Sequence, residues 1–261
     1  MTDVTSELTV HSQYLVKKLS NSKPNLYGTV KFDVVSREIR KWAGGLDRAP
    51  RILDIGCSTS ISKNYLAETG LEFEYCGADY EAAFQPDIVL DATKLTDHKE
   101  DLPWRPDVIT MLDVLEHLPG QANDIESVMR QCCEVVAPGG LVLAVVPQLY
   151  RLDRLKLKHL HYPEHQVRYT LKEWADIIGK AASIESVHGI GYLSCLPYMP
   201  MLSPFYKEDN KHGKLFYHLR GKTFEWGPLK PAEKALTRTL GRLPGMRGWC
   251  NSSLLVCKAK G

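Results

Sequence analysis

The stretch at residues 51–60, which reads RILDIGCSTS, constrains the fold of this chain more than any other feature. Its two isoleucines and its leucine form a short apolar run, which is typical of a buried strand. Gly56 and four small residues follow, and residues 61–68 then have helical composition. An open α/β sheet holds a nucleotide-like ligand with a strand, a tight turn and a helix, because small side chains permit close approach. The helix N-terminus adds N–H groups that the helix itself leaves unpaired.

The residues of this turn leave two interpretations open. Asp54, at the end of the strand, can accept hydrogen bonds from hydroxyl or ammonium groups of a ligand. Alternatively, Ser58 or Ser60 is an ordinary N-cap of the following helix. The residues further along the chain favour the ligand site.

Acidic residues also stand at the ends of the next two expected strands. Asp79 follows Asp54 by 25 residues, and its two carboxylate oxygens suit the adjacent hydroxyls of a ribose, as in dinucleotide-binding folds. Tyr80 comes next and could lie against a base. Asp91 ends the third strand and could reach the amino group of a purine. The alternative for Asp79 is a turn-forming residue without a ligand.

Strands and helices alternate from residue 51 to residue 147, which predicts an α/β fold with a mostly parallel sheet and right-handed crossovers. The apolar run at residues 108–112 predicts a strand that is covered on both faces. The expected strands are residues 51–55, 72–78, 87–90, 107–112, 141–146, 183–190 and 251–260, and the expected helices are residues 29–42, 61–68, 124–136, 170–182 and 232–243. We expect a loop at residues 95–105.

Five sequence blocks follow one another in this region: LDIGCSTS, GAD, LDAT, PDVITMLDVLEHL and VAPGGLVLAVVP. Together they resemble the class I S-adenosylmethionine-dependent methyltransferases, most closely the branch that includes the ubiquinone-biosynthesis O-methyltransferases. The resemblance covers residues 48–180, about half of the chain. It implies a Rossmann-like sheet of seven mostly parallel strands, with the last strand antiparallel beside the sixth. It also implies S-adenosylmethionine as the cofactor.

Two segments lie outside these blocks. We expect an N-terminal helical arm at residues 1–47 and the methyltransferase domain at residues 48–261. Within that domain, residues 191–249 separate the sixth and seventh strands and are rich in proline, aromatic and basic residues. We interpret them as an inserted helical cover over the substrate.

The resemblance assigns roles to the residues at the strand ends. The first turn would hold the methionine part of the cofactor, Asp79 the ribose, and Asp91 with Ala92 the adenine. Leu112 and Asp113 would close the floor of the pocket. The full implied cofactor-binding set is Asp54, Gly56, Cys57, Ser58, Asp79, Tyr80, Asp91, Ala92, Leu112 and Asp113.

The first turn departs from the family pattern at two positions. Ser58 and Ser60 stand where the family has glycine. A serine Cβ narrows the loop and disfavours a positive φ. A methyltransferase-like domain without catalytic activity, which binds or regulates a partner, therefore stays open as an alternative.

Two histidines are candidates for the general base that methyl transfer to a hydroxyl needs. His117 lies just beyond the fourth strand, and His165 lies in a loop before a helix. Each could instead only fix its loop. Asp113, Glu116 and His117 would suit a divalent cation if all three converged, but we predict no metal because nothing in the sequence fixes that geometry.

Composition limits the cellular setting and the class of protein. The chain has 44% hydrophobic and 25% charged residues, as in soluble globular proteins. No apolar run approaches the ~18–20 residues that span a bilayer, and the first 30 residues contain no secretory signal pattern. Seven scattered cysteines without a CxxC pair favour a reducing, cytoplasmic location.

Charge is distributed unevenly along the chain. Residues 207–261 carry 12 Lys/Arg and 4 Asp/Glu, a net charge of +8, and the remainder carries −6. The simplest interpretation is a solvated surface. The alternative is peripheral membrane contact through the basic helix expected at residues 232–243. We expect no nucleic-acid partner, because the sequence lacks the Asn/Asp-Pro-Pro-aromatic motif of enzymes that methylate a flipped base. Nothing in the sequence indicates the oligomeric state.

These observations predict an S-adenosylmethionine-dependent methyltransferase that acts on a small-molecule acceptor or on a lipid- or glycan-linked one. O-methylation is the expected reaction, because the nearest resemblance is to O-methyltransferases and two histidines are available as base. An NAD(P)-dependent oxidoreductase is an alternative on the same kind of sheet. It would need a fuller glycine-rich turn than this chain has.

Overall fold

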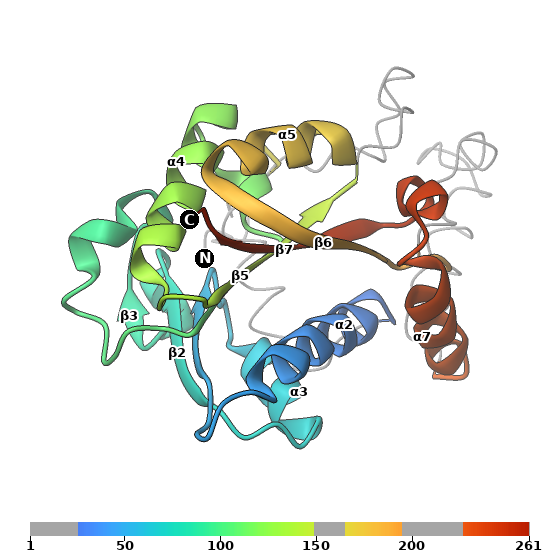
Figure 1. The fold of residues 1–261 in the computed structure, drawn as a ribbon, viewed down its shortest axis with the longest axis horizontal. Helices are drawn as coiled ribbons and strands as arrows, with labels where there is room; N and C mark the ends of the chain where they lie inside the picture. Colours follow the sequence, from blue (N-terminus) through green and yellow to red (C-terminus); the bar gives the residue numbers. More distant parts are fainter. Residues whose placement is uncertain (1–25, 149–164, 195–226, 261) are drawn as a thin grey trace, which may run out of the picture.

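The computed structural model describes residues 26–148, 165–194 and 227–260. These residues form one sheet with helices on both faces (Figure 1). The first 25 residues of the predicted N-terminal arm and the middle of the predicted cover lie outside the described residues. Among the described helices, none has the length and apolar character that a transmembrane segment requires.

The sheet has seven strands in the order β3-β2-β1-β4-β5-β7-β6. The first five strands along the chain pair in parallel, and β7 lies antiparallel between β5 and β6. The predicted fold class, including the antiparallel last strand, is confirmed. The strands are β1 (Arg51–Ile55), β2 (Glu74–Asp79), β3 (Ile88–Val89), β4 (Val108–Leu112), β5 (Leu141–Pro147), β6 (Ala182–Ile190) and β7 (Ser252–Ala259).

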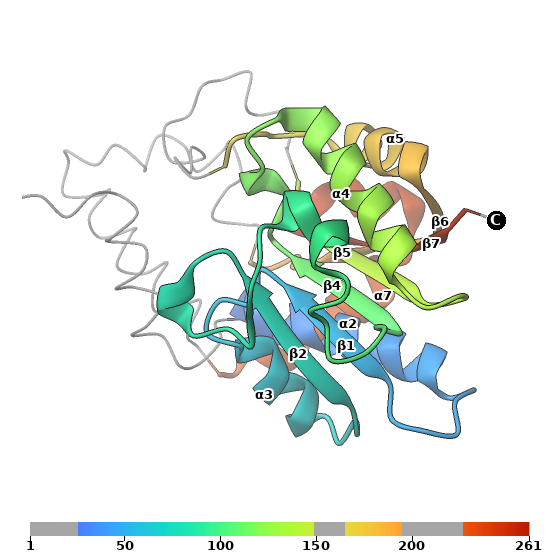
Figure 2. The same ribbon diagram turned by 90° about the vertical axis from the view of Figure 1, so that its left-hand side faces the viewer.

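Two layers of helices cover the two faces of the sheet (Figures 1 and 2). One layer contains α2 (Leu26–Ala43), α3 (Ile61–Glu68) and α7 (Leu229–Leu240). The other contains α4 (Gln121–Val135) and α5 (Leu171–Ala181). The helical spacing of Val30, Val34 and Ile39 turns all three toward the sheet, so α2 is part of the core of the domain.

Short 3-10 helices fill several connections. They are η1 (Ala82–Phe84), η2 (Ala92–His98), η3 (Leu115–His117) and η8 (Pro244–Trp249). The predicted loop at residues 95–105 is therefore wrong in its first part, where η2 continues to His98. Asp91 begins this helix, and its side chain accepts a hydrogen bond from the Thr93 N–H at 2.9 Å. This is the capping geometry that favours a helix start after an aspartate.

The carboxyl ends of the parallel strands meet at one edge of the sheet, where α/β folds bind ligands. β7 starts at this same edge, because its first residue Ser252 pairs with Pro147 at the end of β5. Segments that are distant in the sequence therefore meet at the ligand-binding edge.

Candidate functional site

The turn after β1 is tight and left-handed. Gly56 has φ 72°, and a Cβ at this position would lie 2.4 Å from Cγ2 of Val114. The N–H groups of Gly56 and Cys57 both donate to the Ala78 carbonyl at the end of β2, at 2.8 and 3.1 Å. Only glycine fits this position, because it alone combines a positive φ with so close an approach.

Both serines of the turn also adopt a left-handed backbone. Ser58 has φ 49° and Ser60 has φ 52°, so the turn has positive φ values where the family has glycines. Ser60 occupies the N-cap position of α3, but its side chain makes no capping hydrogen bond. The alternative of plain helix capping therefore does not explain these serines.

Ser58 provides an observation that points to a ligand. Its N–H donates to Oδ2 of Asp79 at 2.8 Å, which connects the first turn to the end of β2. Its hydroxyl oxygen is buried and has no hydrogen-bond partner among the described residues. A buried polar atom of this kind normally has a partner, and a ligand in the turn would provide one.

Asp54 lies beneath the turn and is buried. Its carboxylate accepts hydrogen bonds from the hydroxyls of Thr110 at 2.6 Å, Tyr75 at 2.8 Å and Ser62. Burial raises the pKa of Asp54, and the donating hydroxyls oppose that rise. The structure thus shows Asp54 bonded to the protein's own hydroxyls, which fix the base of the turn.

The residues predicted for ribose and adenine lie at the ends of β2 and β3. Oδ1 of Asp79 accepts from the Glu81 N–H at 3.0 Å, so both of its oxygens have backbone partners. The Tyr80 side chain next to it is 67% exposed and could pack against a base. Asp91 is exposed and Ala92 is half-buried at the start of η2.

Asp113 follows β4 with φ 62° and is held by helix α2. The Tyr27 hydroxyl donates to its Oδ1 at 2.8 Å, and the Lys31 ammonium donates to its Oδ2 at 2.8 Å. Leu112 before it is half-buried. Sequence reasoning missed Tyr27 and Lys31. The helix predicted from the sequence began at residue 29, whereas α2 begins at Leu26 and so places both side chains, four residues apart, on one helical face.

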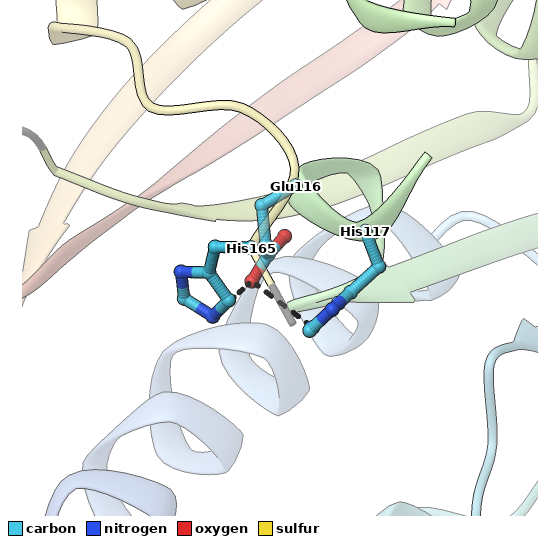
Figure 3. A group of neighbouring side chains, drawn as sticks. All are labelled: Glu116, His117 and His165. Atoms are coloured by element: carbon cyan, nitrogen blue, oxygen red, sulfur yellow. Dashed lines mark ion pairs between the residues drawn. The ribbon is translucent and has the colours of Figure 1, made fainter. Parts of the chain in front are cut away.

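Glu116, His117 and His165 converge beside the end of β4 (Figure 3). The Nε2 atom of His165 lies 3.9 Å from Oε1 of Glu116, and Nε2 of His117 lies 4.0 Å from the same oxygen. The two imidazole rings have centroids 5.0 Å apart and are nearly perpendicular. The two predicted catalytic histidines therefore share one buried carboxylate.

Backbone hydrogen bonds bring the distant His165 to this place. The Gln166 and Val167 N–H groups both donate to the Glu116 carbonyl, at 2.8 and 3.2 Å. Burial, with a contribution from the nearby His117, lowers the pKa of His165 to about 4. His165 is thus neutral at neutral pH and able to accept a proton.

The same three side chains have donor atoms that all lie within 4.8 Å of one another, close enough to hold a metal ion. The set differs from the one weighed on the sequence, since His165 replaces Asp113. Asp113 faces Lys31 and Tyr27 instead. One carboxylate and two imidazoles suit a transition metal better than Mg²⁺, which prefers oxygen ligands.

Comparison with known proteins identifies the family of this chain. A family model described as a methyltransferase domain matches residues 29–181, more than half of the chain. The ubiquinone biosynthesis O-methyltransferase of Yersinia pestis (strain Pestoides F) is 31% identical over 101 residues, which are 35% of this chain and 40% of that protein. The chain thus matches less than half the length of this relative.

Solved structures show the same fold. A SAM-dependent methyltransferase from Archaeoglobus fulgidus superposes with a TM-score of 0.52 at 14% identity, over 96% of this chain and 100% of that one. The plantazolicin methyltransferase BamL has a TM-score of 0.51 at 12% identity, over 96% of this chain and 90% of that one. The chain therefore belongs to the methyltransferase domain family and has the fold of the class I S-adenosylmethionine-dependent enzymes.

Proposed function

We propose that this methyltransferase transfers the methyl group of S-adenosylmethionine to an oxygen atom of a small-molecule acceptor or of a lipid- or glycan-linked one. The observation that carries the proposal is the position of His165, whose Nε2 atom lies 3.9 Å from the buried Glu116 carboxylate, at the same sheet edge as the left-handed turn after β1. Family membership leaves no support for the oxidoreductase alternative.

The turn and the strand ends fit the cofactor. The buried Ser58 hydroxyl is available to the methionine part, and Tyr80 is exposed where a base could stack. Asp79 would accept from the ribose hydroxyls with its remaining lone pairs, because a carboxylate has about four acceptor sites. The structure of the plantazolicin methyltransferase BamL, which has the same fold, was solved in complex with SAH. This supports the assignment of the cofactor.

The bound cofactor supplies a methyl group on a sulfonium, so that a new C–O bond forms as the C–S bond breaks. The protein must remove the proton of the acceptor hydroxyl. Nε2 of His165 faces the Glu116 carboxylate, which favours hydrogen on Nε2 and a lone pair on Nδ1. Nδ1 then takes the proton, and Glu116 stabilises the imidazolium that results.

His117 is the second candidate for the base, because it lies at nearly the same distance from Glu116. Asp113, three residues before Glu116, accepts hydrogen bonds from Tyr27 and Lys31 of α2. We assign to them the positioning of the acceptor side of the site.

The test is calorimetric titration with S-adenosylmethionine, S-adenosylhomocysteine and NAD, followed by methyl-transfer assays on matched phenol, alcohol and amine acceptors. We expect micromolar binding of the first two ligands, no binding of NAD, and product from hydroxyl acceptors. Products from amines alone would contradict O-methylation. Absence of cofactor binding would favour a binding or regulatory domain.

A further inference from the structure

The segment after α7 carries exposed apolar side chains. Leu243 is 50% exposed and Trp249 is 58% exposed, and Pro244 between them is also exposed. Among the described residues, the other large exposed apolar side chains are Tyr80, just after β2, and Val89, on β3. We call Arg242, Leu243, Pro244, Arg247 and Trp249 the η8 lip.

The η8 lip is cationic as well as apolar. Residues 234–261 contain no Asp or Glu. Within the part of the chain that the structure describes, neither Arg242 nor Arg247 takes part in an ion pair. This differs from α7 itself, where Lys234 and Arg238 both pair with Asp33 of α2.

The positive charge of the basic helix predicted at residues 232–243 is thus partly neutralised by Asp33 of α2. Arg238 makes two hydrogen bonds to the Asp33 carboxylate, at 2.7 and 3.1 Å. The positive charge left without an acidic partner lies beyond the helix, in the η8 lip.

Hydrogen bonds fix the backbone of the η8 lip to the sheet. The Gln148 amide donates to the Ser253 hydroxyl at 2.7 Å and to the Arg247 carbonyl. The Tyr192 hydroxyl donates to the Met246 carbonyl at 3.3 Å. The exposed side chains are therefore presented by a structured segment rather than by a chain end.

The η8 lip lies at the ligand-binding edge. Trp249 precedes Ser252, the first residue of β7, by three positions. The Tyr27 hydroxyl that donates to Asp113 also lies 2.8 Å from the Ser252 hydroxyl. Figure 1 shows α7 and the segment after it, in red, at the end of the sheet formed by β6 and β7.

We propose that the η8 lip binds an anionic lipid surface and so brings the site to acceptors held in the bilayer. This inference rests on the proposed function, whose acceptor class it narrows to lipid-linked hydroxyl compounds. A tryptophan, a leucine and a proline beside arginines match the membrane interface, where the aromatic ring sits at headgroup depth. Arginines add attraction to anionic headgroups.

The experiment is co-sedimentation of the full chain, without cofactor, with phosphatidylcholine vesicles and with equimolar phosphatidylcholine and phosphatidylglycerol vesicles. We expect binding to the mixed vesicles, weakened by salt. Arg242→Ser with Arg247→Ser should lower that binding roughly 25-fold, since each cation near the surface contributes about 5-fold. Trp249→Ala with Leu243→Ser should lower it at least tenfold.

The matched control is Lys41→Ser with Lys99→Ser, which removes the same charge from exposed positions elsewhere. This control should bind within about twofold of the wild type. Equal losses from the control and from the η8 lip variants, or no vesicle binding by the wild type, would overturn the proposal. Binding to RNA in place of vesicles would also overturn it. Because no cofactor is used, these outcomes are independent of methyl transfer.

Discussion

The two halves of the ligand-binding edge hold their polar groups differently. In the half that we propose holds the cofactor, at the ends of β1 and β2, carboxylates accept hydrogen bonds of 2.6–3.0 Å from hydroxyls and backbone N–H groups. We call it the cofactor half, and the proposed acceptor side the acceptor half. In the acceptor half, beyond β4, Glu116 and the two histidines lie 3.9–4.0 Å apart. The first half thus places its carboxylates on hydrogen-bond donors of the protein, whereas the second places two imidazoles beside one buried carboxylate.

This difference separates a binding task from a chemical one. A cofactor gains affinity from a preorganised site, whereas a general base must change its protonation state during turnover. Substitutions in the two halves should therefore differ in what they impair, and four experiments test that.

The largest effect is expected in the acceptor half, from His165→Ala. Loss of a general base lowers kcat by about 10²–10⁴-fold, while calorimetric cofactor affinity should stay within about twofold. His98→Ala is the matched control, since this histidine lies on η2 and pairs with Asp101. If His117→Ala lowers kcat and His165→Ala does not, then His117 is the general base and the assignment of His165 is wrong.

In the cofactor half, Gly56→Ala should destabilise the fold by about 3 kcal/mol, through left-handed strain and overpacking against Val114. Gly139→Ala is the control, because Gly139 has φ 76° but open space around its Cβ position. It should cost only about 1 kcal/mol of strain. Urea unfolding measures both, and equal costs would show that contact with Val114 is unimportant.

The pH dependence of stability should report the acceptor half. His165 has its pKa lowered to about 4 in the folded state, mainly by burial, whereas an unfolded histidine titrates near pH 6.5. The unfolded state therefore binds more protons in this window, and stability falls as pH falls from about 6.5 to about 4. The contribution is about 2–3 kcal/mol between pH 7 and about pH 4.5, because one pKa unit corresponds to about 1.4 kcal/mol.

The variant His165→Asn removes this contribution. The free energy of unfolding of the wild type, measured in chelator-containing buffer, should drop more than that of the variant between pH 7 and about pH 4.5. Parallel curves for the two proteins would mean that His165 is not held neutral by burial.

The smallest effect is expected from Ser60→Gly in the cofactor half. Glycine removes the left-handed strain at φ 52° but loses more chain entropy on folding, so the net gain should be about 0.5 kcal/mol. Ser60→Ala keeps the Cβ and should give no gain. The measurement is the melting temperature of each variant. A higher melting temperature for Ser60→Ala than for Ser60→Gly would contradict backbone strain at this position.

The sequence by itself determined the order of strands and helices and the positions of the acids at the strand ends. These features depend on local patterns: apolar runs of strand length, helical spacing such as that of Val30, Val34 and Ile39, and small residues in turns. Asp79 and Asp113 therefore lie at strand ends, as predicted. The serines looked unfavourable for the turn, yet the tertiary fold keeps both at positive φ.

Only the tertiary structure decided which side chains meet. Tyr27 and Lys31 contact Asp113 across 86 and 82 residues, and backbone hydrogen bonds to Glu116 bring His165 into the site. The exposed apolar and cationic side chains of residues 242–249 reach the same edge because β7 pairs with β5. A local sequence pattern determines whether a segment forms a helix or a strand. Which side chains meet in the site depends on how distant segments pack against one another, and no short stretch of sequence contains that information.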